Sequence, residues 1–223
     1  MILEKSEDYK LDIEMLPEHL KPLAQETQNF LETRSIYKAA IKEVSTKLEI
    51  LDDEFSTKYD YNPIHHIESR VKSIQSIFTK LEKKGLDMTM EGVSALTDIA
   101  GIRVICNYID DVYTIASLLV KQDDIELIRE KDYIAKPKLS GYRSLHIVVL
   151  VPVFLSEATR KVPVEIQIRT IAMDTWATLE HELKYKRNKR KEKLSEKDEL
   201  QLLRCAEAMA EVDRRMQEIH REV

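Results

Sequence analysis

Two stretches of the chain combine cations with a carboxylate in a pattern suited to binding polyphosphate. The first is a polar loop, KDYIAKPKLSGYRSLH, which includes Lys138, Arg143 and His146. The second, VPVEIQIRT, follows an apolar run, and in it Glu165 alternates with valine and isoleucine. Cations pair with phosphate oxygens, and a carboxylate can hold a magnesium ion beside them. A hairpin with an ordinary solvated outer face would explain the same pattern.

A second carboxylate, Asp98, lies in the run TDIAGIRV just before an apolar strand. Two carboxylates at strand ends or edges are a common way to hold magnesium with its phosphate ligands. Asp98 could instead be a cap or turn residue, and Glu165 an outward-facing strand residue. Arg103 lies inside the same apolar strand, where a charge facing the core is costly, so we expect it to face a pocket or solvent.

More cations and a hydroxyl recur at three-to-four spacing between about Ile64 and Lys84, a segment that we interpret as one helix ending at Gly85. This helix face could lie along a triphosphate, with an arginine plane available to stack on a base. An ordinary solvated helix face is the alternative. The residues are Arg70, Lys72, Ser76 and Lys80.

Aromatic, histidine and basic residues extend the candidate set. Tyr142 follows Gly141 in the polar loop, where it could stack on a purine or anchor the next strand. His146 begins that strand and is more simply structural, although it could donate to a phosphate. Trp176 is most simply a core residue. The run KYKRNKRKEK, residues 184–193, is either a nucleic-acid patch or a solvated loop between helices.

The composition is that of a globular protein with a charged, helix-rich surface. The 223 residues are 43% hydrophobic and 34% charged, and the formal net charge of −5 argues against nucleic-acid binding through the overall field. Cys106 and Cys205 form no CxxC pair, so neither a zinc site nor a disulfide framework is predicted. The N-terminus lacks a signal-peptide pattern, and no stretch approaches the roughly 20 apolar residues of a membrane span, so we expect a cytoplasmic protein.

Hydrophobic periodicity predicts a sheet flanked by helices at both ends of the chain. Residues from about Pro17 to Tyr59 are interpreted as two helices, ended by Tyr61-Asn62-Pro63. The fold class is therefore α/β (α+β), with a mixed, mostly antiparallel sheet of about five strands. Strands are predicted at 99–108, 125–133, 145–154 and 162–169, short helical turns at 88–97, and helices at 112–121, 171–186 and from an N-cap at Ser195 to about 222.

Four runs carry a family resemblance: SRVKSIQSI, TDIAGIRVIC, DYIAKPKLSGYRSLH and VEIQIRTIAMDTWATLEHELKYK. In this order, over roughly residues 62–186, they resemble the RelA/SpoT-type alarmone synthetases. The resemblance implies a nucleotidyltransferase-like synthetase fold and a stand-alone small synthetase, closer to the RelP branch than to RelQ. We expect no hydrolase domain, since His65-His66 does not supply its metal-binding His-Asp pair. We expect N-terminal helices at 1–61, the catalytic domain at 62–187 and an oligomerisation helix at 188–223, all in one compact unit.

The resemblance also implies an activity: transfer of pyrophosphate from ATP to the 3′-hydroxyl of GDP or GTP, with magnesium, giving ppGpp or pppGpp and AMP. By motif position, Arg70 and Arg103 would sandwich the adenine. Asp98 and Glu165 would hold magnesium, and Glu165 would also help to deprotonate the attacking hydroxyl. The ATP phosphates would be held by Lys72, Ser76 and Lys80.

On the acceptor side, the resemblance implies that Tyr142 stacks on the guanine and that His146 completes a catalytic set with Asp98 and Glu165. RelQ-like members carry asparagine at the position of Asp174, which is expected to take part in guanine recognition. The other residues expected to contact the acceptor nucleotide or the transferred group are Lys138, Arg143 and Gln167.

Family members of this size are homotetramers, so the resemblance implies a homo-oligomer, with ATP and GDP or GTP as substrates and no nucleic-acid or membrane partner. An RNA-binding or regulatory module on the same sheet is the alternative; it predicts salt-sensitive RNA binding that persists when Glu165 is changed. A nucleotidyltransferase would usually need a closely spaced carboxylate pair on one strand. None lies near Asp98, because Asp110 and Asp111 begin a predicted helix.

Overall fold

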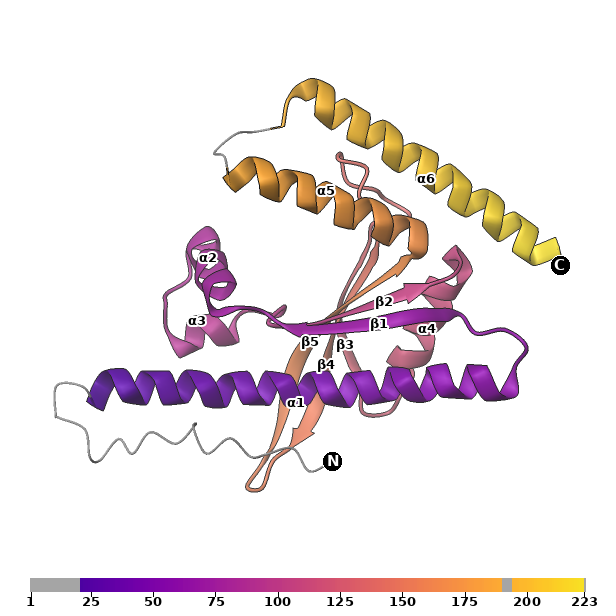
Figure 1. Ribbon diagram of the computed structural model, residues 1–223. Helices are drawn as coiled ribbons and strands as arrows, with labels where there is room; N and C mark the ends of the chain where they lie inside the picture. The colour runs from indigo at the N-terminus through magenta and orange to yellow at the C-terminus, as the bar shows by residue number, and fades with distance from the viewer. Residues whose placement is uncertain (1–20, 190–193, 223) are drawn as a thin grey trace, which may run out of the picture.

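A five-stranded mixed sheet forms the centre of the computed structural model, which describes residues 21–189 and 194–222 (Figure 1). One neighbouring pair, β2 and β5, is parallel, and the other pairs are antiparallel. This arrangement confirms the mixed, mostly antiparallel sheet predicted from the sequence. In spatial order the strands are β1 (Ile64–Val71), β2 (Ala100–Cys106), β5 (Thr159–Thr170), β4 (Leu145–Phe154) and β3 (Glu126–Asp132).

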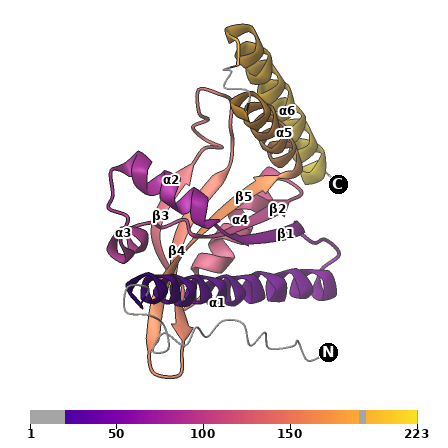
Figure 2. The ribbon, with the colours of Figure 1, turned by 60° about the vertical axis from the view of Figure 1, so that its left-hand side comes forward.

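Helices α1 (Lys21–Lys58) and α4 (Ile109–Val120) share one apolar core with the sheet. In β5, Val164, Ile166 and Ile168 are fully buried in this core, whereas the residues between them belong to the other face. Figures 1 and 2 show α1 crossing the sheet, with α5 (Ile171–Lys189) and α6 (Glu196–Glu222) packed together beyond the end of β5. No helix in the described ranges is long and apolar enough to cross a membrane.

The helix predicted from Ile64 to Lys84 is wrong in its first half, which forms strand β1. Helix α2 (Ile74–Lys84) begins only after this strand, with Ser73 as its N-cap. Ile67 and Val71 lie four residues apart, a spacing that fits one face of a strand as well as one face of a helix. The pairing of β1 with β2 is also irregular between Ile64 and His66. A β-bulge places residues three apart on the same face, so Ile64 and Ile67 imitate helical spacing within a strand.

The two helices predicted between Pro17 and Tyr59 are, over the described residues, one continuous helix, α1. After Pro22 its sequence contains neither glycine nor proline, so nothing interrupts the backbone hydrogen bonds. The predicted start at Pro17 lies outside the described residues. The remaining predicted elements are confirmed with small shifts of their ends, and the predicted turns at 88–97 include α3 (Met90–Ser94).

Two predicted caps are also confirmed. Gly85 ends α2 in the left-handed conformation, with φ of 64°, and its N–H donates to the Glu82 carbonyl oxygen. Ser195 precedes α6, and its hydroxyl oxygen accepts a hydrogen bond from the Asp198 N–H at 3.2 Å.

Helix α6 lies against α5 and the start of α4. The buried indole of Trp176, a predicted core residue, donates to the Leu202 carbonyl oxygen at 2.9 Å. Farther along, the Asp110 N–H donates to the Gln217 side-chain oxygen at 2.8 Å, and Arg221 forms a two-pronged ion pair with the Asp110 carboxylate. These contacts tie α6 to α5 and α4 over most of its length.

Candidate active site

Two rows of residues cross the sheet face that lies opposite the apolar core. Strand pairing aligns them, and because side chains two residues apart share a face, both rows point to the same side. The sheet therefore gathers residues from separate parts of the chain. The first row is Glu68, Arg103, Gln167, His146 and Lys131, and the second includes Arg70, Gly101, Glu165 and Val148.

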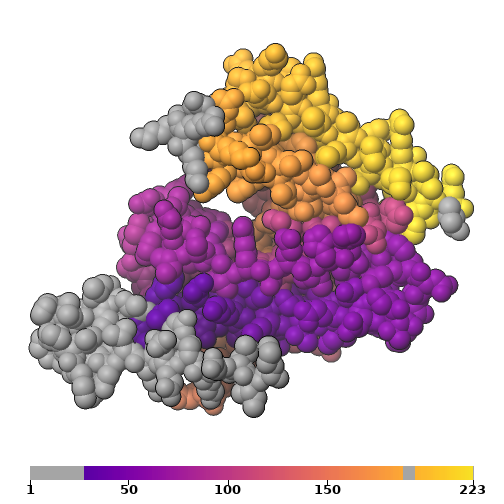
Figure 3. All heavy atoms as spheres, viewed as in Figure 1, coloured from indigo at the N-terminus to yellow at the C-terminus, as the bar shows by residue number. Residues whose placement is uncertain are grey.

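A cavity of about 230 Å³ opens over one part of this face. Gly101, without a side chain, separates Arg70 from Glu165 in the second row. The space-filling view shows this side of the molecule hollowed between the α2 region and α5 (Figure 3). Six residues predicted from the sequence line the cavity: Arg70, Lys72, Asp98, Arg103, Glu165 and Gln167.

Asp98 lies at the edge of the cavity between two lysines. The ammonium groups of Lys72 and Lys80 both pair with its Oδ2 atom. Burial raises the pKa of the Asp98 carboxyl, but hydrogen bonds and charge from the two lysines outweigh burial, and the pKa is lowered overall. Asp98 is therefore a carboxylate at neutral pH, and both lysines are held beside the cavity.

The segment carrying Lys72, Ser76 and Lys80 does not form the single helix face that was predicted. Lys72 follows strand β1, and its N–H donates to the Ile99 carbonyl oxygen at 2.8 Å. Ser76 and Lys80 lie on α2, where the Ser73 hydroxyl oxygen accepts from the Ser76 N–H at 3.3 Å. The strand end and the N-terminus of α2 thus meet next to Asp98. A helix N-terminus with nearby lysines favours anionic groups such as phosphates.

Arg70 and Arg103 come from neighbouring antiparallel strands and lie diagonally on the same face. Diagonal neighbours are roughly 7–8 Å apart, which leaves room for one flat ring between two guanidinium planes. Arg103 donates to Glu68 at 3.1 Å, and its Nε lies 3.5 Å from a carboxylate oxygen of Asp174 on α5. This pairing orients Arg103 across the sheet face.

The donor set of the cavity fits a magnesium ion bound together with phosphates. Asp98 Oδ1 is buried and has no hydrogen-bond partner among the described residues, so one carboxylate oxygen remains to ligate a cation. Glu165 accepts a hydrogen bond from the Gln167 amide at 3.1 Å and lines the same cavity. Within residues 21–189 and 194–222, no three His, Cys, Asp or Glu side chains gather as a metal site. Magnesium commonly uses one or two carboxylates and takes further oxygens from phosphate and water.

An aromatic cluster occupies the other end of the first row. The Lys138 ammonium lies 4.5 Å from the ring centres of both Tyr133 and Tyr142. The ring of Tyr133 stands edge-on to His146, with centroids 5.2 Å apart. The Tyr142 hydroxyl is 2.7 Å from His146 Nε2. Aromatic faces flanked by a cation suit a flat, electron-rich base and its phosphates.

His146 is neutral in this environment. Burial, followed by the positive charges of Arg169 and Lys138, lowers the pKa of the imidazole to about 3. A neutral imidazole has one N–H donor and one acceptor nitrogen, so His146 can give a ligand a single directed hydrogen bond but no positive charge.

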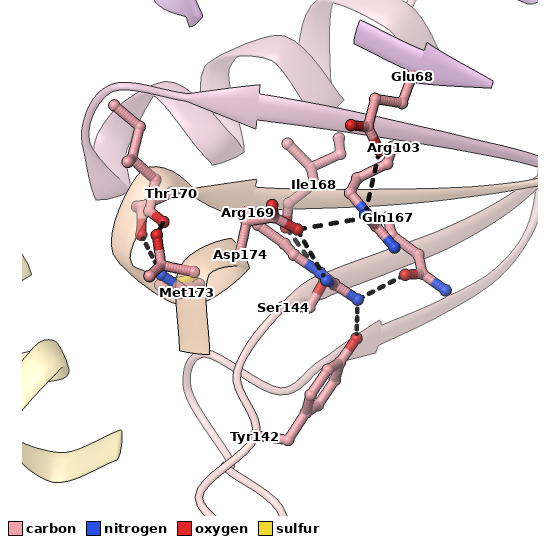
Figure 4. A network of polar contacts seen from close by, with 12 residues as sticks. Glu68, Arg103, Tyr142, Ser144, Gln167, Ile168, Arg169, Thr170, Met173 and Asp174 are labelled. Atoms are coloured by element: carbon pink, nitrogen blue, oxygen red, sulfur yellow. Dashed lines mark hydrogen bonds and ion pairs between the residues drawn. The ribbon is translucent and has the colours of Figure 1, made fainter. Parts of the chain in front are cut away.

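Arg169 connects the aromatic cluster at one end of the sheet face to α5 (Figure 4). The residue is 4% exposed. Its Nη2 donates to the Tyr142 hydroxyl oxygen and to the Gln167 side-chain oxygen, both at 2.6 Å. Its Nη1 donates to Asp174 at 3.1 Å, and its Nε to the Ser144 hydroxyl at 3.4 Å. Arg169 therefore contacts three residues predicted to bind the acceptor nucleotide.

Two predicted features lie apart from this arrangement. Arg143 donates to the carbonyl oxygens of Gly141 and of Ala206 on α6, and it lines a small cavity between α5 and α6. In the basic run, Lys184 pairs with Glu180, Lys186 with Glu182 at 2.6 Å, and Arg187 with Asp198 at 3.7 Å. These cations have acidic partners, which favours the solvated-surface interpretation; residues 190–193 lie outside the described residues.

The sequence interpretation did not include Arg169 or Tyr133 in the site. Arg169 alternates with Glu165 and Gln167 in β5, so period-2 spacing already placed it on the same face. Tyr133 could not be placed in the same way, because it follows β3 and reaches the cluster through tertiary packing.

Comparison with known proteins identifies the same family as the sequence motifs do. Residues 69–190 match the family model described as a region found in RelA/SpoT proteins. The chain is 42% identical to the GTP pyrophosphokinase YwaC of Bacillus subtilis, over 76% of this chain and 81% of that protein. It is 38% identical to YjbM of the same organism, over 84% of this chain and 86% of that protein.

Solved structures give the same result. The small alarmone synthetase 1 of Bacillus subtilis, bound to its product pppGpp, superimposes with a TM-score of 0.81 at 36% identity, over 88% of this chain and 98% of that one. Synthetase 2 of that organism gives a TM-score of 0.77 at 40% identity, over 85% and 98%. The chain belongs to the RelA/SpoT family, among its small alarmone synthetases. The finer assignment to the RelP branch stays a prediction.

Proposed function

We propose that the cleft over the sheet transfers pyrophosphate from ATP to the 3′-hydroxyl of GDP or GTP, yielding ppGpp or pppGpp and AMP. The protein is thus a transferase, a GTP pyrophosphokinase. The observation that carries this proposal is the placement of Asp98, Glu165 and Lys72 around one cavity over the sheet, with Lys80 paired to Asp98 at its edge. Relatives at 42% and 38% identity are named GTP pyrophosphokinases, and a small alarmone synthetase of the same fold was solved with pppGpp.

On the donor side, the adenine would lie between Arg70 and Arg103, as their diagonal placement allows. The triphosphate would extend toward the N-terminus of α2, where Lys72, Ser76 and Lys80 are available. When ATP binds, the lysines could exchange the Asp98 carboxylate for phosphate oxygens. The charges needed to neutralise the triphosphate are thereby already in place.

Asp98 and Glu165 would hold magnesium, whose charge would offset the negative charge of the phosphates during transfer. The acceptor guanine would stack on Tyr142, with Lys138 moving from the ring toward the phosphates. Gln167, His146 and Asp174 would supply directed hydrogen bonds, and the role of Arg143 in acceptor binding stays a prediction.

In the transfer, the acceptor 3′-oxygen forms a bond to the β-phosphorus of ATP, and the bond from that phosphorus to the α-β bridging oxygen breaks. The departing group is AMP. The proton of the 3′-hydroxyl passes to the Glu165 carboxylate, which faces the cavity. The chemistry needs positioning and charge neutralisation and no covalent protein intermediate.

We also propose that the protein assembles as a homo-oligomer, a tetramer as in family members of this size. Apolar side chains on α5 and α6 support assembly: Leu179, Leu183 and Leu200 are about half exposed. The substrates are consistent with the predicted cytoplasmic location.

Glu165→Gln tests the proposed chemistry. The amide keeps the size and the polar contact with Gln167 but cannot accept the proton or carry the charge that holds magnesium, so turnover should fall by about 100-fold or more. Glu126→Gln, which removes a surface ion pair with Lys161, is the matched control and should retain activity. A folded Glu165→Gln variant with near wild-type turnover would refute the assigned role.

A further inference from the structure

Arg169, a buried residue that was not predicted to contact a substrate, connects the part of the site around Arg103 with the aromatic cluster around Tyr142. The guanidinium of Arg169 places three nitrogens among four partners at 2.6–3.4 Å. Asp174 receives one of these hydrogen bonds and lies 3.5 Å from Arg103. A continuous chain of contacts thus runs from Arg103 through Asp174 and Arg169 to Tyr142 (Figure 4). Only arginine has a rigid fork that can make so many directed contacts at once.

Hydrogen-bond direction along this chain follows from what each group can donate. Arginine has no acceptor, so Arg169 donates and the Tyr142 oxygen accepts. The phenolic proton then remains for the other close partner, His146 Nε2, at 2.7 Å. Because the imidazole is neutral and Nε2 accepts, its own proton must be on Nδ1.

We propose that Arg169 is a positioning residue for the acceptor nucleotide, which holds the ring of Tyr142 in place and, through the tyrosine hydroxyl, fixes the Nδ1–H tautomer of His146. The inference rests on the proposed function, in which Tyr142 and His146 contact the acceptor. Arg169 itself is buried beneath them and touches no substrate. Arg169 thereby determines that His146 presents its Nδ1–H as the hydrogen-bond donor on the sheet face.

The first test compares the two substrates in steady-state kinetics. Arg169→Lys keeps the charge beside Asp174 but loses the fork, so the KM for GDP should rise about tenfold or more, while the KM for ATP stays within about twofold. Arg215→Lys, at an exposed ion pair on α6, is the matched control and should behave as wild type. An equal rise in both KM values, or an unchanged KM for GDP, would overturn the proposal.

Tyr142→Phe keeps the ring and removes only the hydroxyl that joins Arg169 to His146. In the double variant with Arg169→Lys, the fold-increase in the KM for GDP should be smaller than the product of the two single fold-increases. The reason is that both changes break the same chain of hydrogen bonds. Fully multiplicative effects would contradict a shared chain. Thermal unfolding of each variant separates this result from a general loss of structure.

The second test does not depend on activity. Nitrogen-15 NMR of the imidazole should show His146 with its proton on Nδ1 in the wild type, and a mixture of tautomers in Tyr142→Phe. A wild-type proton on Nε2, or an unchanged tautomer in the variant, would overturn the proposal even if Arg169→Lys fails to fold. The two proposals can fail separately. If the wild type makes no pyrophosphorylated product, the proposed function is refuted. If the tautomer of His146 still differs as expected between the wild type and Tyr142→Phe, the hydrogen-bond chain is supported all the same.

Discussion

At the scale of single residues, the site combines groups that neutralise charge with groups that present flat faces. Asp98, Lys72 and Lys80 form a compact cluster at one end, and the aromatic cluster around Tyr142 lies at the other. Glu165 lies between them in β5. Phosphoryl-type transfer depends on positioning the two substrates and neutralising their charge. The charged cluster at one end of the site and the aromatic cluster at the other are suited to these two tasks.

Tyr142→Ala is expected to weaken acceptor binding. The substitution removes the ring on which the guanine would stack, and the KM for GDP or GTP should rise by about tenfold or more. The KM for ATP should change little, because the residues proposed to bind ATP lie on β1, β2 and α2 and in the turn between β1 and α2. Steady-state kinetics with each substrate varied in turn makes the measurement, and an unchanged acceptor KM would exclude stacking.

His146 should make the folded protein sensitive to mild acid. Burial and then the charges of Arg169 and Lys138 lower the pKa of His146 to about 3 in the folded protein, whereas an unperturbed histidine has a pKa of about 6.5. Between these values the unfolded chain binds a proton that the folded protein does not, so the free energy of unfolding falls as the pH falls through this window.

Urea unfolding of wild type and His146→Gln at pH 7 and pH 5 measures this effect. The variant should lose less of its free energy of unfolding on acidification than the wild type does, whatever its stability at pH 7. His181→Gln, at an exposed position on α5, is the matched control for removing a histidine. Equal losses in the wild type and His146→Gln would contradict the effect of burial.

At the scale of elements, α6 supports the loop that carries Tyr142 and Arg143, two residues proposed to bind the acceptor. Gly141 in that loop has φ of 89°, and a Cβ there would lie 2.5 Å from the Ala206 Cβ and 3.1 Å from Leu203 Cδ1. The Arg143 guanidinium adds a hydrogen bond to the Ala206 carbonyl oxygen at 3.4 Å. The position of Tyr142, the next residue after Gly141, therefore depends on a helix more than 60 residues farther along the chain.

Gly141→Ala should be destabilising by about 1–3 kcal/mol, because it combines a left-handed backbone conformation with a steric clash. It should also raise the KM for the acceptor, since the loop must move away from α6. Adding Ala206→Gly removes one of the clashing atoms, so a double-mutant cycle in urea unfolding should show favourable coupling. Additive effects would mean that the loop does not rest on Ala206.

The helices and strands also show which structural features could be predicted from a single sequence. Alternation in β5 correctly predicted that Glu165 and Gln167 share a face, and the apolar strands and the C-terminal helices were placed well because their periodic patterns are long. The strand at Ile64–Val71 was missed because the four-residue spacing of Ile67 and Val71 fits one face of a strand as well as one face of a helix. Arg169 was not recognised as part of the site, because the spacing places its side chain on a face but does not identify its partners.

At the scale of the whole molecule, the site is assembled from segments far apart in the sequence. The parallel pairing of β2 with β5 brings Arg103 beside Gln167, and the hairpin of β4 and β5 adds His146. Helix α5 contributes Asp174, and α6 packs against the loop that carries Tyr142. These long-range contacts were outside the reach of local patterns, and the family resemblance of the motifs was what joined them in the sequence-based prediction.

The most direct test of the central claim is product analysis by ion-exchange chromatography after mixing purified protein with ATP, magnesium and GDP or GTP. We predict a guanosine product carrying a 3′-pyrophosphate, with AMP released in equal amount, and loss of both when EDTA removes the metal. Transfer of a nucleotidyl group with release of pyrophosphate, or no new guanosine product with either acceptor, would contradict the account.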